Sequence, residues 1–226
     1  MPQIAVLLPC YNEALTIAQV VADFKSVLPE ATIYVFDNNS RDDSAARATQ
    51  AGATVISVPE QGKGHVVRAM FHTVTADAFI MADADGTYDY TRARELLAPI
   101  LSGEADIVIG TRQTTDKAAY PSGHRIGNKL FNLLVGTLFG QGLVDIFSGY
   151  RTFSPRFVQQ FPARSTGFEI ETEMSVYILQ EKIPFREIPT AYGARPEGSA
   201  SKLRTFRDGF RILYTILRLF LASLFR

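Results

Sequence analysis

The stretch Phe79-Ile80-Met81-Ala82-Asp83-Ala84-Asp85-Gly86-Thr87 is the part of the chain that best indicates its fold. Its apolar residues suit a buried parallel strand, which usually forms a continuous hydrophobic run. The run ends in two carboxylates one residue apart, where a strand would leave the core and where α/β sheets bind ligands. Taken alone, Asp-Gly is more typical of a solvated turn. At a buried sheet edge, however, two carboxylates need a cation, and hard oxygen ligands favour Mg²⁺ or Mn²⁺.

The segments on either side alternate between strand-like and helix-like patterns. Short apolar runs predict strands at 4–8, 32–36, 55–58, 78–82 and 106–110. Helical spacing of apolar residues predicts helices between these strands. The later part of the chain predicts a helix at 126–139, a strand-like run at 147–153, a helix at 169–179 and a short strand at 185–188. This alternation favours an α/β fold with a mostly parallel central sheet flanked by helices.

Composition limits the class of protein. The chain has 226 residues, of which 46% are hydrophobic and 20% charged, and this length suits one well-filled α/β domain. Its formal net charge of zero argues against a nucleic-acid partner. The single cysteine, Cys10, excludes an internal disulfide and fits a reducing compartment. We expect a cytoplasmic protein, because neither a signal peptide nor an apolar run of about 20 residues is evident.

Polar groups follow four of the expected strands. They are Tyr11/Glu13, Asp37/Asn38, Asp83/Asp85 and Thr111/Arg112. Because parallel strands end at a shared edge, these groups are expected to converge on one ligand. Gly62-Lys63-Gly64 adds a cation and, at a helix start, backbone amides that would suit an anion. Acids, cation and amides together predict a site for a metal-bound nucleotide diphosphate.

Two other interpretations of these motifs fit the sequence less well. A Rossmann dinucleotide site needs G-x-G-x-x-G after its first strand, and the chain has Pro9-Cys10-Tyr11-Asn12-Glu13 there. A phosphatase of the haloacid dehalogenase type is the more serious alternative, with Asp83 as phosphorylated nucleophile and Asp85 as general acid. That motif normally opens its fold, whereas here several strand–helix units precede it.

The ordered set of motifs resembles the family 2 glycosyltransferases of GT-A fold, in the branch around dolichol-phosphate mannose synthase and the bacterial polyprenyl-phosphate glycosyltransferases. The resemblance spans nearly the whole chain. The matching segments are 8–13 (LPCYNE), 37–40 (DNNS), 62–64 (GKG), 83–85 (DAD), 110–112 (GTR), 145–151 (DIFSGYR) and 195–203 (RPEGSASKL). This chain differs from the branch at two places. Many members have Asp-Asp at the positions of Asp37-Asn38, and the mannose synthases have a Gln that binds the metal at the position of Thr87.

The resemblance implies an inverting transferase that moves a sugar from a UDP- or GDP-sugar, with roles for particular residues. Asp85 would bind the metal, Mg²⁺ or Mn²⁺, with Asp83 beside it at the ribose and sugar. The residues implied to hold the nucleotide sugar are Pro9, Tyr11, Glu13, Asp37, Lys63, Asp83, Asp85, Arg195, Ser201 and Lys202. Arg112 and Arg125 would face the acceptor phosphate.

The identity of the acceptor determines whether a catalytic base is needed. A polyprenyl phosphate (dolichyl or undecaprenyl) is already an anion near pH 7, so it needs arginines rather than a base. A saccharide hydroxyl needs a general base, for which Asp145 is the leading candidate. Glu169, Glu171 and Glu173 stand at the start of an expected helix, where carboxylates suit the helix dipole.

The last segment, 204–226, predicts a basic amphipathic helix. Arg207, Arg211, Thr215, Arg218 and Arg226 fall on one helical stripe, and apolar residues cover the rest. Such a helix suits a membrane interface, and the alternative is a helix packed on the sheet with solvated arginines. We therefore expect a catalytic domain over 1–203, with a nucleotide-sugar half (1–112) and an acceptor half (113–203), and an interface anchor over 204–226.

These expectations place the protein at the periphery of a membrane, on its cytoplasmic face. An integral-membrane partner or a homo-oligomer is compatible with the same anchor, and no nucleic-acid partner is expected. A non-enzymatic membrane adaptor is the remaining alternative to an enzyme. Binding of a nucleotide sugar distinguishes the two.

Overall fold

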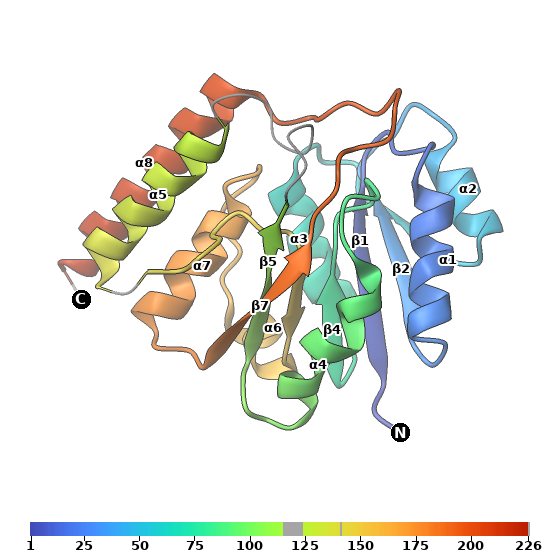
Figure 1. Ribbon diagram of the computed structural model, residues 1–226, viewed down its shortest axis with the longest axis horizontal. Coiled ribbons are helices and arrows are strands. Elements are labelled where there is room, and N and C mark those ends of the chain that lie inside the picture. The colour runs from blue at the N-terminus through green and yellow to red at the C-terminus, as the bar shows by residue number, and fades with distance from the viewer. Residues whose placement is uncertain (115–123, 141, 226) are drawn as a thin grey trace.

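The computed structural model describes residues 1–114, 124–140 and 142–225, apart from the side chains of His124 and Arg125. Within this part of the chain, seven strands form one sheet in the order β3-β2-β1-β4-β6-β5-β7 (Figure 1). Every strand but β6 runs in the same direction, and β6 is antiparallel to both neighbours. The strands are β1 (Ile4–Cys10), β2 (Thr32–Asp37), β3 (Thr54–Ser57), β4 (Ala78–Met81), β5 (Ile107–Gln113), β6 (Arg151–Phe153) and β7 (Phe185–Ala191).

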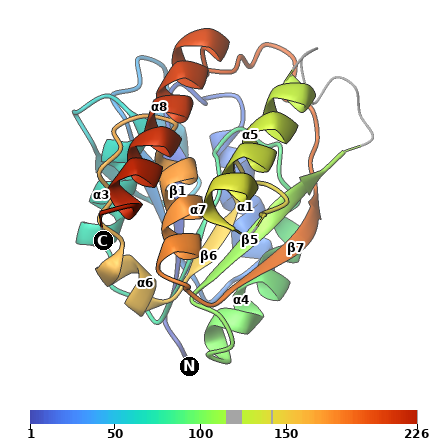
Figure 2. The same ribbon diagram turned by 90° about the vertical axis from the view of Figure 1, so that its left-hand side faces the viewer.

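Helices cover both faces of the sheet (Figures 1 and 2). One face packs against α1 (Ile17–Val27), α2 (Ser44–Gln50) and α4 (Ala93–Leu101), the last preceded by a 3₁₀ turn, η1 (Tyr90–Arg92). The other face packs against α3 (Lys63–Thr73), α5 (His124–Phe139), α6 (Pro155–Gln160), α7 (Ile170–Gln180) and α8 (Thr205–Ser223). Helices on both sides explain why the central strands are apolar throughout.

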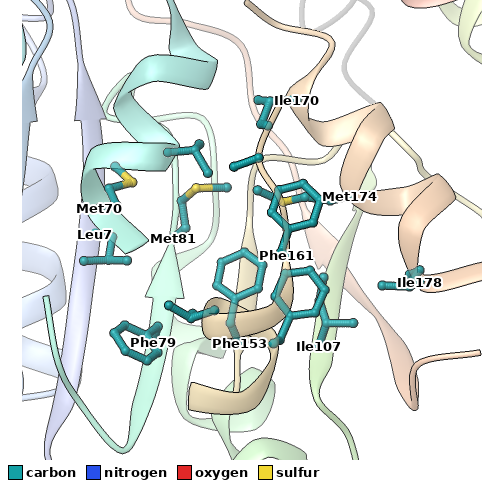
Figure 3. Packing of buried hydrophobic residues seen from close by; sticks show 14 of the residues in the cluster. Leu7, Met70, Phe79, Met81, Ile107, Phe153, Phe161, Ile170, Met174 and Ile178 are labelled. Carbon is teal, nitrogen blue, oxygen red and sulfur yellow. The ribbon is translucent and has the colours of Figure 1, made fainter. Parts of the chain in front are cut away.

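The pleat of β1 divides its side chains between two cores. Ala5 and Leu7 belong to the core under α3 and α7, and Val6 and Leu8 belong to the core under α1 and α4. Because successive strand residues point to opposite faces, a strand buried on both sides needs a continuous hydrophobic run. Figure 3 shows the core under α3 and α7, which includes Leu7 and Met81 of the sheet and Met174 of α7.

The structure confirms the mostly parallel sheet but corrects the run at 147–153. Only Arg151–Phe153 forms a strand, and it is antiparallel. Hydrogen bonds that involve side chains hold the two residues at 148–149 before this strand. Ser148 Oγ donates to the carbonyl of Gly110, and Gly149 N donates to the hydroxyl of Tyr88. The short helix α6 was not predicted, although Ser154 caps it and Pro155 follows directly.

The C-terminal helix, expected over 204–226, is found as α8 at Thr205–Ser223, and Arg226 lies outside the described residues. It packs against α7 and α5 with a face that contains Asp208, Ile212, Thr215 and Ile216. Thr215 is therefore buried rather than part of an exposed arginine stripe. No helix in the described residues is long and apolar enough to cross a membrane.

The start of α3 lies unusually close to the segment that leads into α7. Gly64 N donates to the carbonyl of Thr166 at 3.1 Å. A Cβ atom on Gly64 would lie 2.1 Å from the carbonyl oxygen of Ser165 and 2.8 Å from the carbonyl carbon of Thr166. Because these neighbours are backbone atoms, they cannot rotate away. Only glycine permits this approach, which joins the two expected halves of the chain.

Replacing Gly64 by Ala should therefore destabilise the fold. We expect the free energy of unfolding to fall by about 3 kcal/mol, at the upper end of the usual cost of overpacking. Equilibrium denaturation by urea, followed by circular dichroism, measures the change.

The matched control is Gly209→Ala in α8, where an added Cβ meets no atom within 4 Å. This variant should gain about 0.5–1 kcal/mol, because alanine loses less backbone entropy in a helix. Equal stability of Gly64→Ala and the unmodified chain would contradict the steric role of Gly64.

Candidate functional site

A cleft opens beyond the carboxyl ends of β1, β2 and β4. The chain runs from β1 outward through β2 and β3 and then returns to β4 on the other side of β1. Such a switch in strand order is where α/β sheets leave a crevice for ligands. The residues lining the cleft are Pro9, Cys10, Tyr11, Glu13, Asn38, Gln61, Gly62, Lys63, Val66, Asp83, Ala84, Phe168, Arg195, Ser201, Lys202 and Leu203.

The cleft brings together most of the residues predicted for the nucleotide sugar. Pro9, Tyr11 and Glu13 follow β1, Asp83 follows β4, and the chain after β7 supplies Arg195, Ser201 and Lys202. Asp37 and Asp85 do not line it, but Asp85 lies behind Arg195 and forms an ion pair with it. Eight of the ten residues predicted for the nucleotide sugar therefore lie around one cleft, Thr111 and Arg112 do not line it, and the role of each residue remains a prediction.

Both carboxylate oxygens of Asp85 are engaged. Thr87 donates to Oδ1 from its hydroxyl at 2.6 Å and from its backbone amide at 3.1 Å. The guanidinium of Arg195 lies 2.6 Å from Oδ2. Burial, and then the neighbouring charge of Asp83, raise the pKa of Asp85, while Arg195 opposes the shift. Thr87 thus orients the Asp85 carboxylate.

Glu13 holds the segment after β7 over the cleft. Its Oε1 accepts from Arg195 at 3.1 Å and from Lys202 Nζ at 2.7 Å. Lys202 also donates to the carbonyl of Asn12 at 2.8 Å. Burial would lower the pKa of Arg195, but the charges of Asp85 and Glu13 outweigh it and raise the pKa. Two cations and two carboxylates therefore compensate one another at the mouth of the cleft.

The Gly62-Lys63-Gly64 turn is not the exposed anion site that the sequence indicates. Gly62 N donates to the side chain of Asn38, and Gly64 N donates to the carbonyl of Thr166. The Lys63 ammonium lies 2.5 Å from Asp83 Oδ1 and 2.5 Å from Glu171 Oε1. The prediction of free amides is therefore wrong, because both glycines serve close packing and Lys63 bridges two carboxylates.

Asn38 is a structural residue of the cleft wall. Its Nδ2 donates to the carbonyls of Val58 and Glu60, at 2.9 and 2.7 Å, and its Oδ1 accepts from Gly62 N at 2.8 Å. An aspartate could not donate either bond, so the Asn in this chain is tied to the path of the 58–62 loop. In the neighbouring Asp37, Oδ2 accepts from Ser40 N, and Oδ1 is buried with no hydrogen bond from the described residues.

Arg112 and Asp145 form a two-pronged ion pair. Arg112 Nε lies 2.7 Å from Asp145 Oδ2, and the guanidinium donates to Oδ1 at 2.8 Å. Burial alone would raise the pKa of Asp145, but Arg112 and the backbone amides of Arg112 and Phe147 lower it. Arg112 also lies over the ring of Tyr192, 5.3 Å from its centre. The side chain of Arg125, the other arginine predicted for the acceptor, lies outside the described residues.

The oxygen donors beside the cleft suit a hard divalent cation shared with a ligand. Asp83 Oδ2 accepts no hydrogen bond from any described residue, and Asp85 Oδ2 has only Arg195. No group of three or more His, Cys, Asp or Glu among the described residues would hold a metal by itself. A cation there would need further oxygens, which the phosphates of a nucleotide commonly supply.

The sequence missed the role of Glu171. It appeared as one of three carboxylates at the start of α7, yet it is only 4% exposed and pairs with Lys63. Glu169 and Glu173 instead accept backbone amides in the 164–167 segment. The sequence offered one signal, which was three glutamates close together at the start of this helix. Such a cluster does not identify a partner elsewhere in the chain.

Replacing Asn38 by Asp should destabilise the cleft wall. Two buried carbonyls lose their donors, and each unpaired buried group costs about 1–3 kcal/mol. We expect the free energy of unfolding to fall by about 3 kcal/mol, measured by urea denaturation. Asn39→Asp makes the same chemical change at the adjacent exposed position and should stay within about 0.5 kcal/mol of the unmodified chain. Similar losses in the two variants would contradict the role given to Asn38.

Comparison with known proteins agrees with this geometry. Residues 5–161 match the profile described as Glycosyl transferase family 2. The chain is 37% identical to the glycosyltransferase AglJ of Haloferax volcanii over 217 residues, which cover 95% of this chain and 71% of AglJ. It is 32% identical to the hexosyltransferase Agl6 of the same organism, over 93% of this chain and 52% of Agl6. It is also 52% identical to the RfbJ protein of Shigella flexneri, over 54% of this chain and 95% of RfbJ.

Solved structures support the fold independently. Glucosyl-3-phosphoglycerate synthase from Mycobacterium tuberculosis, in complex with Mn²⁺, UDP and phosphoglyceric acid, superimposes with a TM-score of 0.78 at 20% identity. The similarity covers 97% of this chain and 78% of the synthase. It confirms the GT-A fold expected from the motifs.

These matches overturn two of the alternatives. A phosphatase that uses Asp83 as its nucleophile and a non-enzymatic adaptor are both incompatible with the family profile, which spans more than half of the chain. The similarity to AglJ extends the same relationship to almost the whole chain. The chain therefore belongs to glycosyl transferase family 2 and is a glycosyltransferase that uses a nucleotide sugar.

Proposed function

We propose that this enzyme transfers a hexose, with inversion, from a UDP- or GDP-sugar to a polyprenyl phosphate at the cytoplasmic face of a membrane. The observation that carries the proposal is that the donor cleft and an exposed apolar surface are connected by one short segment of chain. The segment that closes the donor cleft, with Ser201 and Lys202, leads directly into α8, which carries a large exposed apolar face. Donor cleft and apolar face thus adjoin, as an enzyme with a soluble donor and a lipid acceptor requires.

The donor would occupy the cleft. Pro9, Tyr11 and Glu13 line it and would hold the base and ribose. Asp37, to which the resemblance gives the same role, does not line the cleft, and its buried Oδ1 has no hydrogen bond from the described residues. Arg195, Ser201 and Lys202 would bind the diphosphate once the two cations leave Glu13 and Asp85. The complexes of the mycobacterial synthase with UDP-glucose support a UDP-sugar as the first donor to test.

Asp85, with Asp83, would hold Mg²⁺ or Mn²⁺; the open Oδ2 of Asp83, the Asp85 Oδ2 that only Arg195 contacts and the Mn²⁺ complexes of the mycobacterial synthase support this assignment. Such a cation would offset the charge on the departing nucleoside diphosphate. Arg195 adds positive charge at the same place. Because the guanidinium lies against Asp85, donor and cation binding would move it from the carboxylate toward the diphosphate.

The state of Asp145 favours a phosphate acceptor over a saccharide hydroxyl. A general base works best when its pKa lies near the operating pH. Arg112 and two backbone amides lower the pKa of Asp145 and occupy its oxygens, which makes it a weak base. A phosphate acceptor arrives ionised and needs cations, and Arg112 and Arg125 are the residues we assign to it.

The exposed apolar face consists of residues from two helices. Both α5 and α8 pack on α7 and lie side by side, so their outer surfaces share one side of the molecule (Figures 1 and 2). We call this surface the α5–α8 face: Ile126, Leu130, Leu133, Phe206, Phe210, Tyr214, Leu217, Leu221 and Leu224. Exposed Arg207, Arg211 and Arg218 flank it. Apolar residues beside arginines suit an anionic membrane surface.

The transfer reaction itself tests the proposal. Purified enzyme should release UDP or GDP from its sugar donor only when a polyprenyl phosphate and Mn²⁺ or Mg²⁺ are present. Asp85→Asn should lower kcat/KM at least about a hundredfold, the usual cost of removing one such stabilising group. Asp43→Asn, the same change at an exposed carboxylate at the start of α2, should leave the rate unchanged.

Equal release with a free saccharide and with a polyprenyl phosphate would refute the acceptor assignment. Full activity of Asp85→Asn, or full activity in excess chelator, would refute the metal assignment. Mass spectrometry of the lipid product would identify the transferred sugar.

Binding to vesicles tests the α5–α8 face separately. The enzyme should co-sediment with phosphatidylglycerol vesicles, and Phe210→Glu should weaken the partition at least about tenfold. Replacing Arg207 and Arg211 by Gln should weaken it about thirtyfold, since each arginine near an anionic surface contributes about 1 kcal/mol. Leu101→Glu changes an exposed leucine away from this face and is the matched control.

Unchanged partition in Phe210→Glu would refute the membrane assignment. A concentration-dependent dimer that the same substitution dissociates would assign the α5–α8 face to a second copy of the chain instead.

A further inference from the structure

We propose that Glu171 is a positioning residue for the sugar donor, which acts by holding the ammonium of Lys63 against Asp83. This inference rests on the proposed function, because Asp83 then faces the donor. The helix dipole does not account for Glu171. Glu173, on the same first turn of α7, satisfies backbone amides of the preceding segment, whereas Glu171 is directed to a lysine on a different helix.

The three charges form a compact bridge. Lys63 Nζ lies 2.5 Å from Asp83 Oδ1 and 2.5 Å from Glu171 Oε1. The side chain of Glu171 is 5% exposed and that of Lys63 11%, whereas that of Asp83 is 28% exposed and lines the cleft. The bridge therefore runs from the protein interior to the cleft wall. Its buried end is Glu171, and its accessible end is Asp83.

Lysine by itself is a poor positioning group, because its ammonium sits on a flexible four-carbon stem. Here two contacts remove that freedom. The start of α3 is fixed against the Ser165–Thr166 backbone through the close approach of Gly64, and Glu171 holds the ammonium at the other end of the side chain. Both supports come from the segment 165–171, so the location of Lys63 depends on the second half of the chain.

The second oxygen of Asp83 is positioned from the opposite side. A Cβ atom on Gly149 would lie 2.7 Å from Asp83 Oδ2, so that oxygen occupies space that only a glycine leaves open. Oδ1 is bound to Lys63 and Oδ2 lies over Gly149, so Oδ2 remains available to a ligand. This close approach explains why position 149 of the Ser148-Gly149-Tyr150 segment is a glycine, since a side chain there would collide with Asp83.

The bridge also changes the role of Lys63. Its ammonium is shared by two carboxylates and is not directed at a diphosphate. Two other cations line the cleft and would be available to the phosphates: Arg195, which pairs with Glu13 and Asp85, and Lys202, which pairs with Glu13. Lys63 thus offsets the charge of Asp83 beside Asp85, which lets two neighbouring carboxylates coexist.

Isothermal titration of the full chain with UDP or GDP in Mn²⁺ tests this inference without any acceptor. Glu171→Gln should weaken nucleotide affinity about tenfold. In the Lys63→Met background the same substitution should change affinity by less than about twofold, because its effect requires the lysine. Glu171→Gln should also raise the melting temperature of the Lys63→Met variant, since Lys63→Met alone leaves the buried Glu171 carboxylate without a cation.

Glu173→Gln is the matched control, because it removes a buried charge from the same helix turn without contact to Lys63. Its affinity should remain within about twofold of the unmodified chain. Should Glu171→Gln prove unfolded, Glu171→Asp keeps the charge, withdraws the carboxylate by one methylene and serves the same comparison.

Unchanged affinity in Glu171→Gln would overturn the inference, as would an equal loss with and without Lys63, or an equal loss in Glu173→Gln. Failure of the unmodified chain to bind either nucleotide would instead overturn the proposed function. The two results are distinguishable because the second is seen before any substitution is made.

Discussion

The buried ammonium of Lys63 between Asp83 and Glu171 is the contact on which the architecture of the cleft depends. Asp83 follows the central strand β4, and Glu171 belongs to α7, which covers one face of the sheet. Glu171 is almost fully buried and Asp83 lies at the accessible end of the same bridge, and two carboxylates this close to each other would be costly without a cation. The lysine removes that cost, and in doing so it ties the first half of the chain to the second at the edge where the cleft opens.

A second set of charges compensates at the mouth of the cleft. Arg195 and Lys202 lie against Glu13 and Asp85, so the segment after β7 folds over the cleft. The buried and the outer charge groups differ in accessibility. The side chain of Glu171 is almost fully buried, whereas those of Arg195 and Lys202 are about one quarter exposed. In the proposed function the outer cations are therefore the ones that a diphosphate would recruit, while the inner bridge is suited to hold its shape.

The arrangement of α5 and α8 links the donor cleft to a surface of a different character. Both helices bury one face on α7 and leave aromatic and aliphatic side chains on the other. The segment closing the cleft continues into α8, so any movement of Arg195 and Lys202 toward a ligand occurs a few residues from that apolar face. In the proposed function this proximity brings a lipid-borne phosphate and a soluble donor to one place.

By itself, the sequence determined the sheet and the contents of its edge. The apolar runs of β1 and β4, the polar residues after them and the Gly62-Lys63-Gly64 turn were enough to predict a mostly parallel α/β fold and a site containing Glu13, Lys63 and Asp83. Arg195 was added only by the resemblance to the family 2 glycosyltransferases. Local patterns carry this information, because strand periodicity and the position of polar residues at strand ends depend on near neighbours in the chain. Tertiary structure alone decided which charges pair. Lys63 with Glu171 and Arg112 with Asp145 are partners 108 and 33 residues apart, and no local pattern encodes such pairings. The same holds for Gly64 and Asn38, whose identities follow from backbone atoms that only the folded chain brings within reach.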